Sequence, residues 1–222
     1  MLDIETFDQA LIRSERRLVA RLTTPSTIQA FLDEITYSAE NTYRCPLRVM
    51  RERICNCFDG ALFAVALLRR IGNPPLILNM IANDRDDDHL LALLRRDGYW
   101  GAVSKANFAG LRFREPIYRN LRELVMSYFE QYYNVNREKT LRGYSKILNL
   151  EAFDKYHWMT LDEPLELIAT RLDKVRNVPL LTNRMLAALS RIDERSYRAG
   201  LFGANEACLF RPAGKKHERR FT

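Results

Sequence analysis

Two residues of the sequence have the types and the order of a nucleophile and its base: Cys57 and His89. Cys57 begins an apolar run that we expect to form a helix, and His89 begins a run that we expect to form a strand. The N-terminal end of a helix lowers the pKa of a thiol there, and an imidazole nearby can accept its proton. The backbone N–H of Cys57 is a candidate donor to an oxyanion. The two residues therefore predict cysteine-dependent hydrolysis or acyl transfer.

The remaining cysteines and histidines offer weaker alternatives. Cys55 precedes the helix and gains less from its dipole, and the Cys55-Asn-Cys57 spacing is shorter than the C-x-x-C of zinc sites. His157 follows a helical pattern, and His217 stands in a basic tail. We therefore expect no metal and no cofactor, with His89 as the base.

Each of the two residues also has an ordinary structural interpretation. A cysteine in an apolar run is commonly an inert core residue, and a histidine after acidic residues is commonly a solvated loop residue. The choice between structure and chemistry therefore depends on the elements that position Cys57 and His89.

The pattern around these residues predicts a buried helix followed by strands. The run 57–71 is apolar on nearly all sides until its basic end, which indicates a helix inside a domain. Residues 76–82 have strand character, and 83–88 form an acidic loop. Two apolar segments flank Asp97-Gly98, a hairpin signal. Helices are predicted at 3–22, 25–39, 120–133, 162–175 and 182–197.

These elements predict an α+β fold in which a central Cys-bearing helix packs on an antiparallel sheet of three or more strands. Helices at both ends of the chain are expected to surround this centre. We divide the sequence into a core at 1–150 that includes the N-terminal helices, a helical C-terminal extension packed on the core at 151–210, and a basic tail at 211–222.

The order of the elements resembles the transglutaminase-like superfamily of papain-like cysteine enzymes. The matching residues are Cys57, Ala61, Leu67-Leu68-Arg69, Gly72, Pro74, His89 and the Gly98-Tyr99-Trp100 turn. The resemblance covers about residues 28–110, and the remainder is similar to a bacterial subgroup that carries this domain. It implies that Cys57 is the nucleophile, that His89 is its base and that the substrate is an amide of a peptide or protein.

The sequence departs from the family at the third catalytic position, where the resemblance implies an aspartate that orients the histidine. Ser104 stands at the expected spacing, and Asn107 follows it. A two-residue turn at Asp97-Gly98 would pair His89 with Ala106 and place Ser104 on the histidine face. A turn one residue longer would place Asn107 there instead. Spacing favours Ser104. Chemistry favours Asn107, because an amide oxygen accepts the imidazole N–H more firmly, so both remain candidates.

Four further residues are candidates for substrate binding. Asp59 lies in the first turn of the Cys helix, where it can shape the cleft or simply suit the helix start. Trp100 belongs to the hairpin. Arg112 and Arg114 follow the hairpin and have the chemistry of a carboxylate clamp, although a charged strand edge is the plainer interpretation.

Composition limits the partners and the compartment. The net charge is +7, but five of the basic residues and only one acid lie in 211–222, which leaves +3 for the rest of the chain. No nucleic-acid-binding motif accompanies this tail, so we do not expect nucleic-acid binding. No apolar run reaches the ~20 residues of a membrane span, and no secretion signal is evident. We therefore expect a cytoplasmic protein.

The sequence thus predicts a transglutaminase-like cysteine hydrolase or acyltransferase, a thiol-protease-like chemistry that proceeds through a thioester of Cys57. Without the aspartate, an imidazolium at His89 would be less stabilised. The alternative is a catalytically degenerate domain that binds a protein or peptide.

Overall fold

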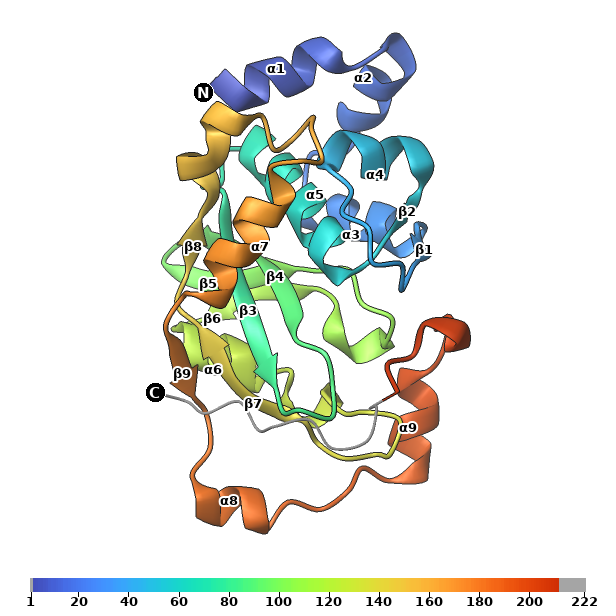
Figure 1. Ribbon diagram of the computed structural model, residues 1–222, viewed down its shortest axis with the longest axis vertical. Coiled ribbons are helices and arrows are strands. Elements are labelled where there is room, and N and C mark those ends of the chain that lie inside the picture. Colours follow the sequence, from blue (N-terminus) through green and yellow to red (C-terminus); the bar gives the residue numbers. More distant parts are fainter. Residues whose placement is uncertain (1, 212–222) are drawn as a thin grey trace.

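The computed structural model describes residues 2–211 as a mixed α/β fold organised around one antiparallel sheet (Figure 1). The seven strands of this sheet follow the order β6-β5-β4-β3-β7-β9, and β8 pairs with β3 beside β7. Their bounds are β3 Leu76–Ala82, β4 His89–Arg96, β5 Tyr99–Val103, β6 Arg114–Tyr118, β7 Leu141–Ser145, β8 Leu148–Asn149 and β9 Asn177–Pro179. The antiparallel sheet predicted from the sequence is confirmed.

One face of the sheet is covered by the helix that carries Cys57. This helix, α5 (Cys57–Arg70), packs against β3 and β4, and its residues 58–68 are all buried. The helices that share its hydrophobic core include α1 (Leu2–Ala10), α3 (Pro25–Asp33), α4 (Pro46–Glu52) and α7 (Leu165–Asp173). The expected packing of a central Cys-bearing helix on the sheet is therefore confirmed.

Aromatic side chains cover the opposite face. Tyr128 and Tyr132 are buried against Leu91 and Leu93 of β4, beside α6 (Leu121–Met126) and the short 3₁₀ helix η2 (Phe129–Gln131). With apolar cover on both faces, β4 carries six consecutive buried residues from His89 to Leu94. Burial on both faces explains why its sequence lacks the alternation of a half-exposed strand.

The hairpin between β4 and β5 has the shorter of the two predicted turns. Arg96 pairs with Tyr99, and both turn residues have positive φ angles, 52° at Asp97 and 87° at Gly98. This is the conformation of the two-residue turn whose twist matches a hairpin. The register that places Ser104 on the histidine face is therefore confirmed.

Several predicted helices are shorter than their sequence patterns. The single helix expected at 3–22 is wrong, because Ile12 is extended and separates α1 from α2 (Arg13–Val19). The helix expected at 25–39 ends at Asp33, because β1 (Thr36–Tyr37) pairs with β2 (Ile54–Cys55). The helix expected at 120–133 divides into α6 and η2. In each case a backbone break or a tertiary contact overrides the local periodicity.

The segment 151–210 is not wholly helical as expected. It contains η3 (Leu150–Tyr156), α7, α8 (Asn183–Ala187), α9 (Glu194–Gly200) and η4 (Glu206–Cys208), but its strand β9 joins the sheet beside β7. Within residues 2–211 no helix combines the length and apolarity that crossing a membrane requires. Apart from Arg211, the predicted basic tail lies outside the described residues.

Candidate active site

Cys57 is the first residue of α5, as the sequence predicts. The side chain of Asn56 caps the helix by accepting the backbone N–H of Asp59 at 2.9 Å. The Cys57 thiol is partly buried and lies 3.9 Å from the carbonyl oxygen of Asp88, at the end of the acidic loop. The thiol therefore stands between the N-terminal end of the buried helix and the loop that leads to His89.

His89 is held at the start of β4 by that loop. It pairs with Met80 of β3, and the carboxylate of Asp88 accepts from the Asn79 amide and from the backbone N–H of Ala82, each at 2.9 Å. The His89 side chain is 6 % exposed. These contacts fix the backbone on both sides of the imidazole.

The hydrogen bonds of His89 identify its tautomer. Nε2 lies 3.1 Å from the carbonyl oxygen of Leu111 and 3.3 Å from the hydroxyl of Ser104, which itself donates to the same carbonyl at 2.6 Å. A carbonyl oxygen only accepts, so Nε2 carries the proton. Nδ1 is consequently the nitrogen with a lone pair, as a general base requires.

The structure separates the two candidates for the third position. Ser104 is fully buried and contacts His89. Asn107 instead bonds to the C-terminal part of the chain: its Nδ2 donates to the carbonyl of Asn205 at 3.0 Å, and its Oδ1 accepts the N–H of Asn205 at 2.8 Å. Of these two candidates, only Ser104 contacts the imidazole.

Cys57 and His89 line one small cavity of about 70 Å³. Within the described residues their side chains are not hydrogen-bonded to each other, since the thiol faces Asp88. The same cavity is lined by Cys208, Leu209 and Phe210. We call residues 205–210 the covering segment. With this segment in place, the cavity is too small for a peptide.

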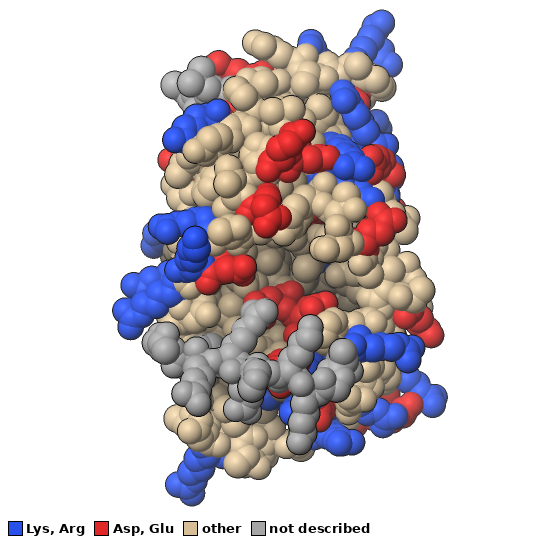
Figure 2. All heavy atoms as spheres, in the orientation of Figure 1, with Lys and Arg blue, Asp and Glu red and all other residues tan. Residues whose placement is uncertain are grey.

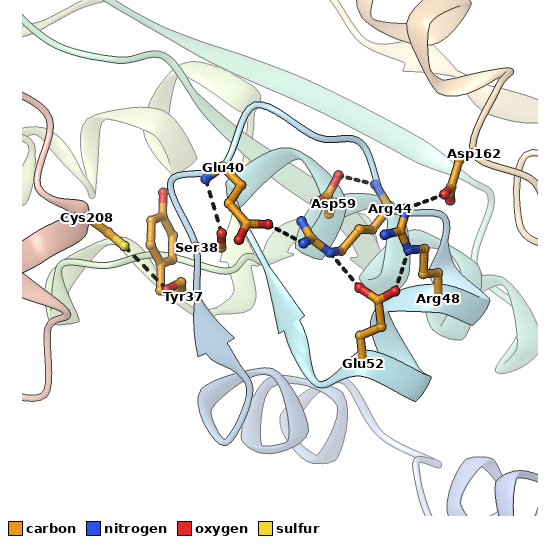
Figure 3. Close-up of polar contacts among 9 residues, drawn as sticks. All are labelled: Tyr37, Ser38, Glu40, Arg44, Arg48, Glu52, Asp59, Asp162 and Cys208. Carbon is orange, nitrogen blue, oxygen red and sulfur yellow. Dashed lines mark hydrogen bonds and ion pairs between the residues drawn. The ribbon is translucent and has the colours of Figure 1, made fainter.

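The covering segment is fastened next to the thiol at Tyr37 as well as at Asn107. The carbonyl of Tyr37 accepts from the Asn205 amide at 3.2 Å. It also accepts from the Cys208 thiol at 3.5 Å (Figure 3). The Tyr37 side chain lines the cavity and is hydrogen-bonded to Cys57.

Both candidate catalytic groups are neutral in this closed arrangement. Burial raises the pKa of Cys57 to about 12, with a further rise from the charges of Asp87 and Asp59. Hydrogen bonds from the backbone of Leu90 and from Tyr37 lower the pKa of the thiol but do not outweigh burial. Burial likewise lowers the pKa of His89 to about 4. The helix start alone therefore does not produce a thiolate.

Asp59 serves the structure around the Cys helix rather than the cavity. It is fully buried, does not line the cavity, and accepts the backbone N–H of Arg44 at 3.0 Å. Burial raises the pKa of Asp59 to about 6. Arg44 and Arg48 continue this contact into a network that joins α4, the loop before it and the segment just before α7 (Figure 3): Glu40, Arg44, Arg48, Glu52, Asp59 and Asp162.

The other three predicted substrate-binding residues lie away from Cys57. Trp100 is on β5, where the guanidinium of Arg95 lies 5.2 Å from its ring. Arg112 forms an ion pair with Asp33 at 2.6 Å. Arg114 donates to Ser127 and to nearby carbonyls and covers the ring of Tyr128 at 3.9 Å. None of the three lines the Cys57 cavity.

Sequence reasoning missed three parts of the site. The carbonyl of Leu111 is a backbone group, which no side-chain pattern reveals. Tyr37 lies on the short strand β1, and its pairing with Cys55 brings it next to Cys57. The covering segment is distant in sequence from the residues it contacts. Within residues 2–211 no group of three or more His, Cys, Asp or Glu side chains is arranged to hold a metal ion.

Comparisons with known proteins return only distant likenesses. No family model matches the chain, and no curated protein matches it. Among solved structures, LapG of Legionella pneumophila is 11% identical, with a TM-score of 0.33, over 46% of this chain and 70% of that one. EGTA-treated LapG of the same organism is 10% identical, with a TM-score of 0.38. This match covers 73% of this chain and 95% of that one. At these TM-scores neither likeness carries an argument about this site.

Proposed function

We propose that the chain is a transglutaminase-like cysteine hydrolase or acyltransferase that acts on an amide of a peptide or protein through a thioester of Cys57. The observation that carries the proposal is the tautomer of His89. Its protonated Nε2 is bound to the Leu111 carbonyl, so the unprotonated Nδ1 remains to serve the cavity that Cys57 also lines. The order of Cys helix, strand, His strand and hairpin, which resembles the transglutaminase-like superfamily, supports the same assignment.

The proposed reaction begins when the thiol turns from the Asp88 carbonyl toward Nδ1 of His89. Nδ1 takes the thiol proton as Sγ attacks the substrate carbonyl carbon, and the N–H of Cys57 donates to the oxyanion. The C–S bond is then complete, the C–N bond breaks, and Nδ1 returns the proton to the departing amine. Water or a second amine attacks the thioester and releases Cys57.

The reaction requires the covering segment to move away from the cavity. Burial is the main cause of the raised pKa of Cys57, so hydration of the thiol would lower that pKa. The carbonyl of Leu111 would still orient His89, but it lacks the negative charge with which a carboxylate stabilises an imidazolium.

A second candidate function is a catalytically degenerate, peptide-binding domain. The neutral thiol and the chain segment that lines the cavity favour it. In that case the place of the covering segment would be the place of a bound peptide, with no covalent step.

Acylation by p-nitrophenyl acetate distinguishes the two functions. An active Cys57 should release nitrophenolate in a burst, carry the acetyl group and then lose it to water. General-base loss in His89→Ala should slow acetylation by about 10²- to 10⁴-fold. Peptide mass spectrometry after a timed quench gives the acetylated fraction at each cysteine.

Cys55→Ser is the matched control, because Cys55 is buried two positions before Cys57 and does not line the cavity. This variant should keep the burst. Equal acetylation rates of Cys57 in the wild-type and His89→Ala chains would reject the enzyme and favour the binding domain.

A further inference from the structure

Two thiols, Cys57 and Cys208, lie where two hollows of the molecule meet. One hollow is the small cavity described above, and the other, of about 420 Å³, lies between the loop after β1, the acidic loop before β4 and the C-terminal part of α7. Both residues line both hollows and are partly exposed. The other two cysteines of the chain, Cys45 and Cys55, are buried and line neither hollow. Cys57 and Cys208 are thus the pair of thiols that share an open space.

Tyr37 contacts both thiols and limits the distance between them. Its backbone carbonyl accepts from the Cys208 thiol at 3.5 Å (Figure 3), and its side chain is hydrogen-bonded to Cys57. The separation of the two sulfur atoms therefore cannot exceed the length of one tyrosine and two hydrogen bonds. A disulfide requires Cβ atoms about 3.5–4.5 Å apart, so Cys208 must leave the Tyr37 carbonyl and turn toward Cys57.

The surroundings of Cys208 permit this movement, whereas those of Cys57 hold it in place. Cys57 is the first residue of the buried helix α5. Cys208 ends the 3₁₀ helix η4, which is three residues long and contains no buried residue. Its contact with Tyr37 is a weak hydrogen bond, because a thiol is a poor donor. Turning the side chain of Cys208 therefore breaks little structure.

We propose that Cys57 and Cys208 form a reversible disulfide on oxidation, which locks the covering segment over the cavity and blocks the nucleophile. The disulfide itself does not depend on the proposed function, but its effect on activity rests on that function. A covalent bond from residue 208 to the Cys helix would replace the few hydrogen bonds that now fasten the segment. The redox state of this pair would then decide whether the cavity opens.

Hydrogen peroxide is the proposed oxidant, because it is small and uncharged. Figure 2 shows a hollow near the middle of one face with acidic side chains around it, and Glu40 and Asp173 line the wider of the two hollows. Burial raises the pKa of Cys57 to about 12, so Cys57 is the slower thiol, and we assign the first step to Cys208.

The chemistry takes two steps and consumes one peroxide. The sulfur of Cys208 attacks a peroxide oxygen, the O–O bond breaks, and a sulfenic acid and one water form. The sulfur of Cys57 then attacks the sulfur of Cys208, the S–O bond breaks, and the departing hydroxyl leaves as water with the proton of the Cys57 thiol. In total the two thiols lose two electrons and two protons, and the peroxide is reduced to two waters.

Peroxide treatment of the full chain tests the proposal. After a quench with N-ethylmaleimide in denaturant, the number of free thiols should fall from four to two, and a non-reducing digest should contain the peptides of Cys57 and Cys208 joined. Dithiothreitol should restore all four. Cys208→Ser should form no such crosslink, and Cys55→Ser, the matched control, should form it as the wild type does. Tenfold dilution of the protein should leave the joined fraction unchanged, because the bond lies within one chain.

The acylation assay separates this inference from the proposed function. The oxidised wild type should lose the nitrophenolate burst, and Cys208→Ser should keep it after the same treatment. If the reduced chain shows no burst but the joined peptides form, the disulfide stands and the enzyme does not. Oxidation that leaves Cys57 and Cys208 unjoined overturns the proposal, and so does a crosslink of Cys208 to Cys55 or to a second chain.

Discussion

Replacing Asn107 by alanine should uncover Cys57. The Asn107 amide forms two hydrogen bonds with the backbone of Asn205, at 2.8 and 3.0 Å, and these bonds fasten the covering segment at its start. A hydrogen bond contributes about 0.5–1.5 kcal/mol, and the lower part of that range suits a partly exposed pair. The loss of both should therefore shift the balance between the closed and lifted segment by about 1–2 kcal/mol, or roughly 5- to 30-fold.

Alkylation of Cys57 by iodoacetamide reports this shift. If the thiol reacts only when the segment is lifted, the rate should rise by the same roughly 5- to 30-fold, since local opening limits access. Hydration then lowers the pKa of the thiol and can only add to the increase. Asn149→Ala is the matched control, because Asn149 is an exposed asparagine that caps η3 away from the cavity. Faster hydrogen exchange of 205–210 with an unchanged alkylation rate would refute the reasoning.

Three further perturbations test the packing and charge of the site. His89 is neutral in the fold because its pKa falls from 6.5 to about 4, so its contribution to stability is present above pH 6.5 and is lost as the pH falls toward 4. As the pH falls between those values, the free energy of unfolding measured in urea should decrease by up to about 3 kcal/mol more for the wild type than for His89→Asn. An equal pH dependence of this free energy in the two chains would contradict this. Asp59→Asn removes a buried charge that raises the pKa of Cys57, so the pH midpoint of Cys57 alkylation should move down; an upward shift would count against this charge effect. Gly60→Ala should lower the melting temperature, because the new Cβ would lie 2.3 Å from Cβ of Lys105 and overpacking costs about 1–3 kcal/mol. A higher melting temperature would mean that helix propensity prevails.

The sequence predicted the elements that depend on local signals. The apolar run after Asn56 placed the start of the Cys helix at Cys57, and Asp97-Gly98 fixed the turn that pairs Arg96 with Tyr99. Because strand alternation follows from that turn, the neighbour of His89 could be reduced to Ser104 or Asn107 before the fold was known.

The sequence could not predict contacts between distant segments. Asn107 and Asn205 meet through a side-chain amide and a backbone, which produces no periodic pattern. The end of α3 depends on β1 pairing with β2, and residues 25–39 alone continue to favour a helix. The charge at the thiol also depends on burial and on Asp87, so a helix start was insufficient to predict the protonation state of Cys57.

The third position of the site shows the same limit in its chemistry. The resemblance implies an aspartate, and the sequence offers Ser104, but the shorter bond from Nε2 of His89 is to the carbonyl of Leu111. Any residue can supply a carbonyl, so sequence cannot reveal this acceptor. A carbonyl fixes the tautomer as a carboxylate would, yet it brings no full negative charge to balance an imidazolium. In the proposed enzyme the imidazole of His89 would therefore be oriented for proton transfer but not stabilised as a cation. This favours a neutral thiol and a neutral base while the covering segment is in place.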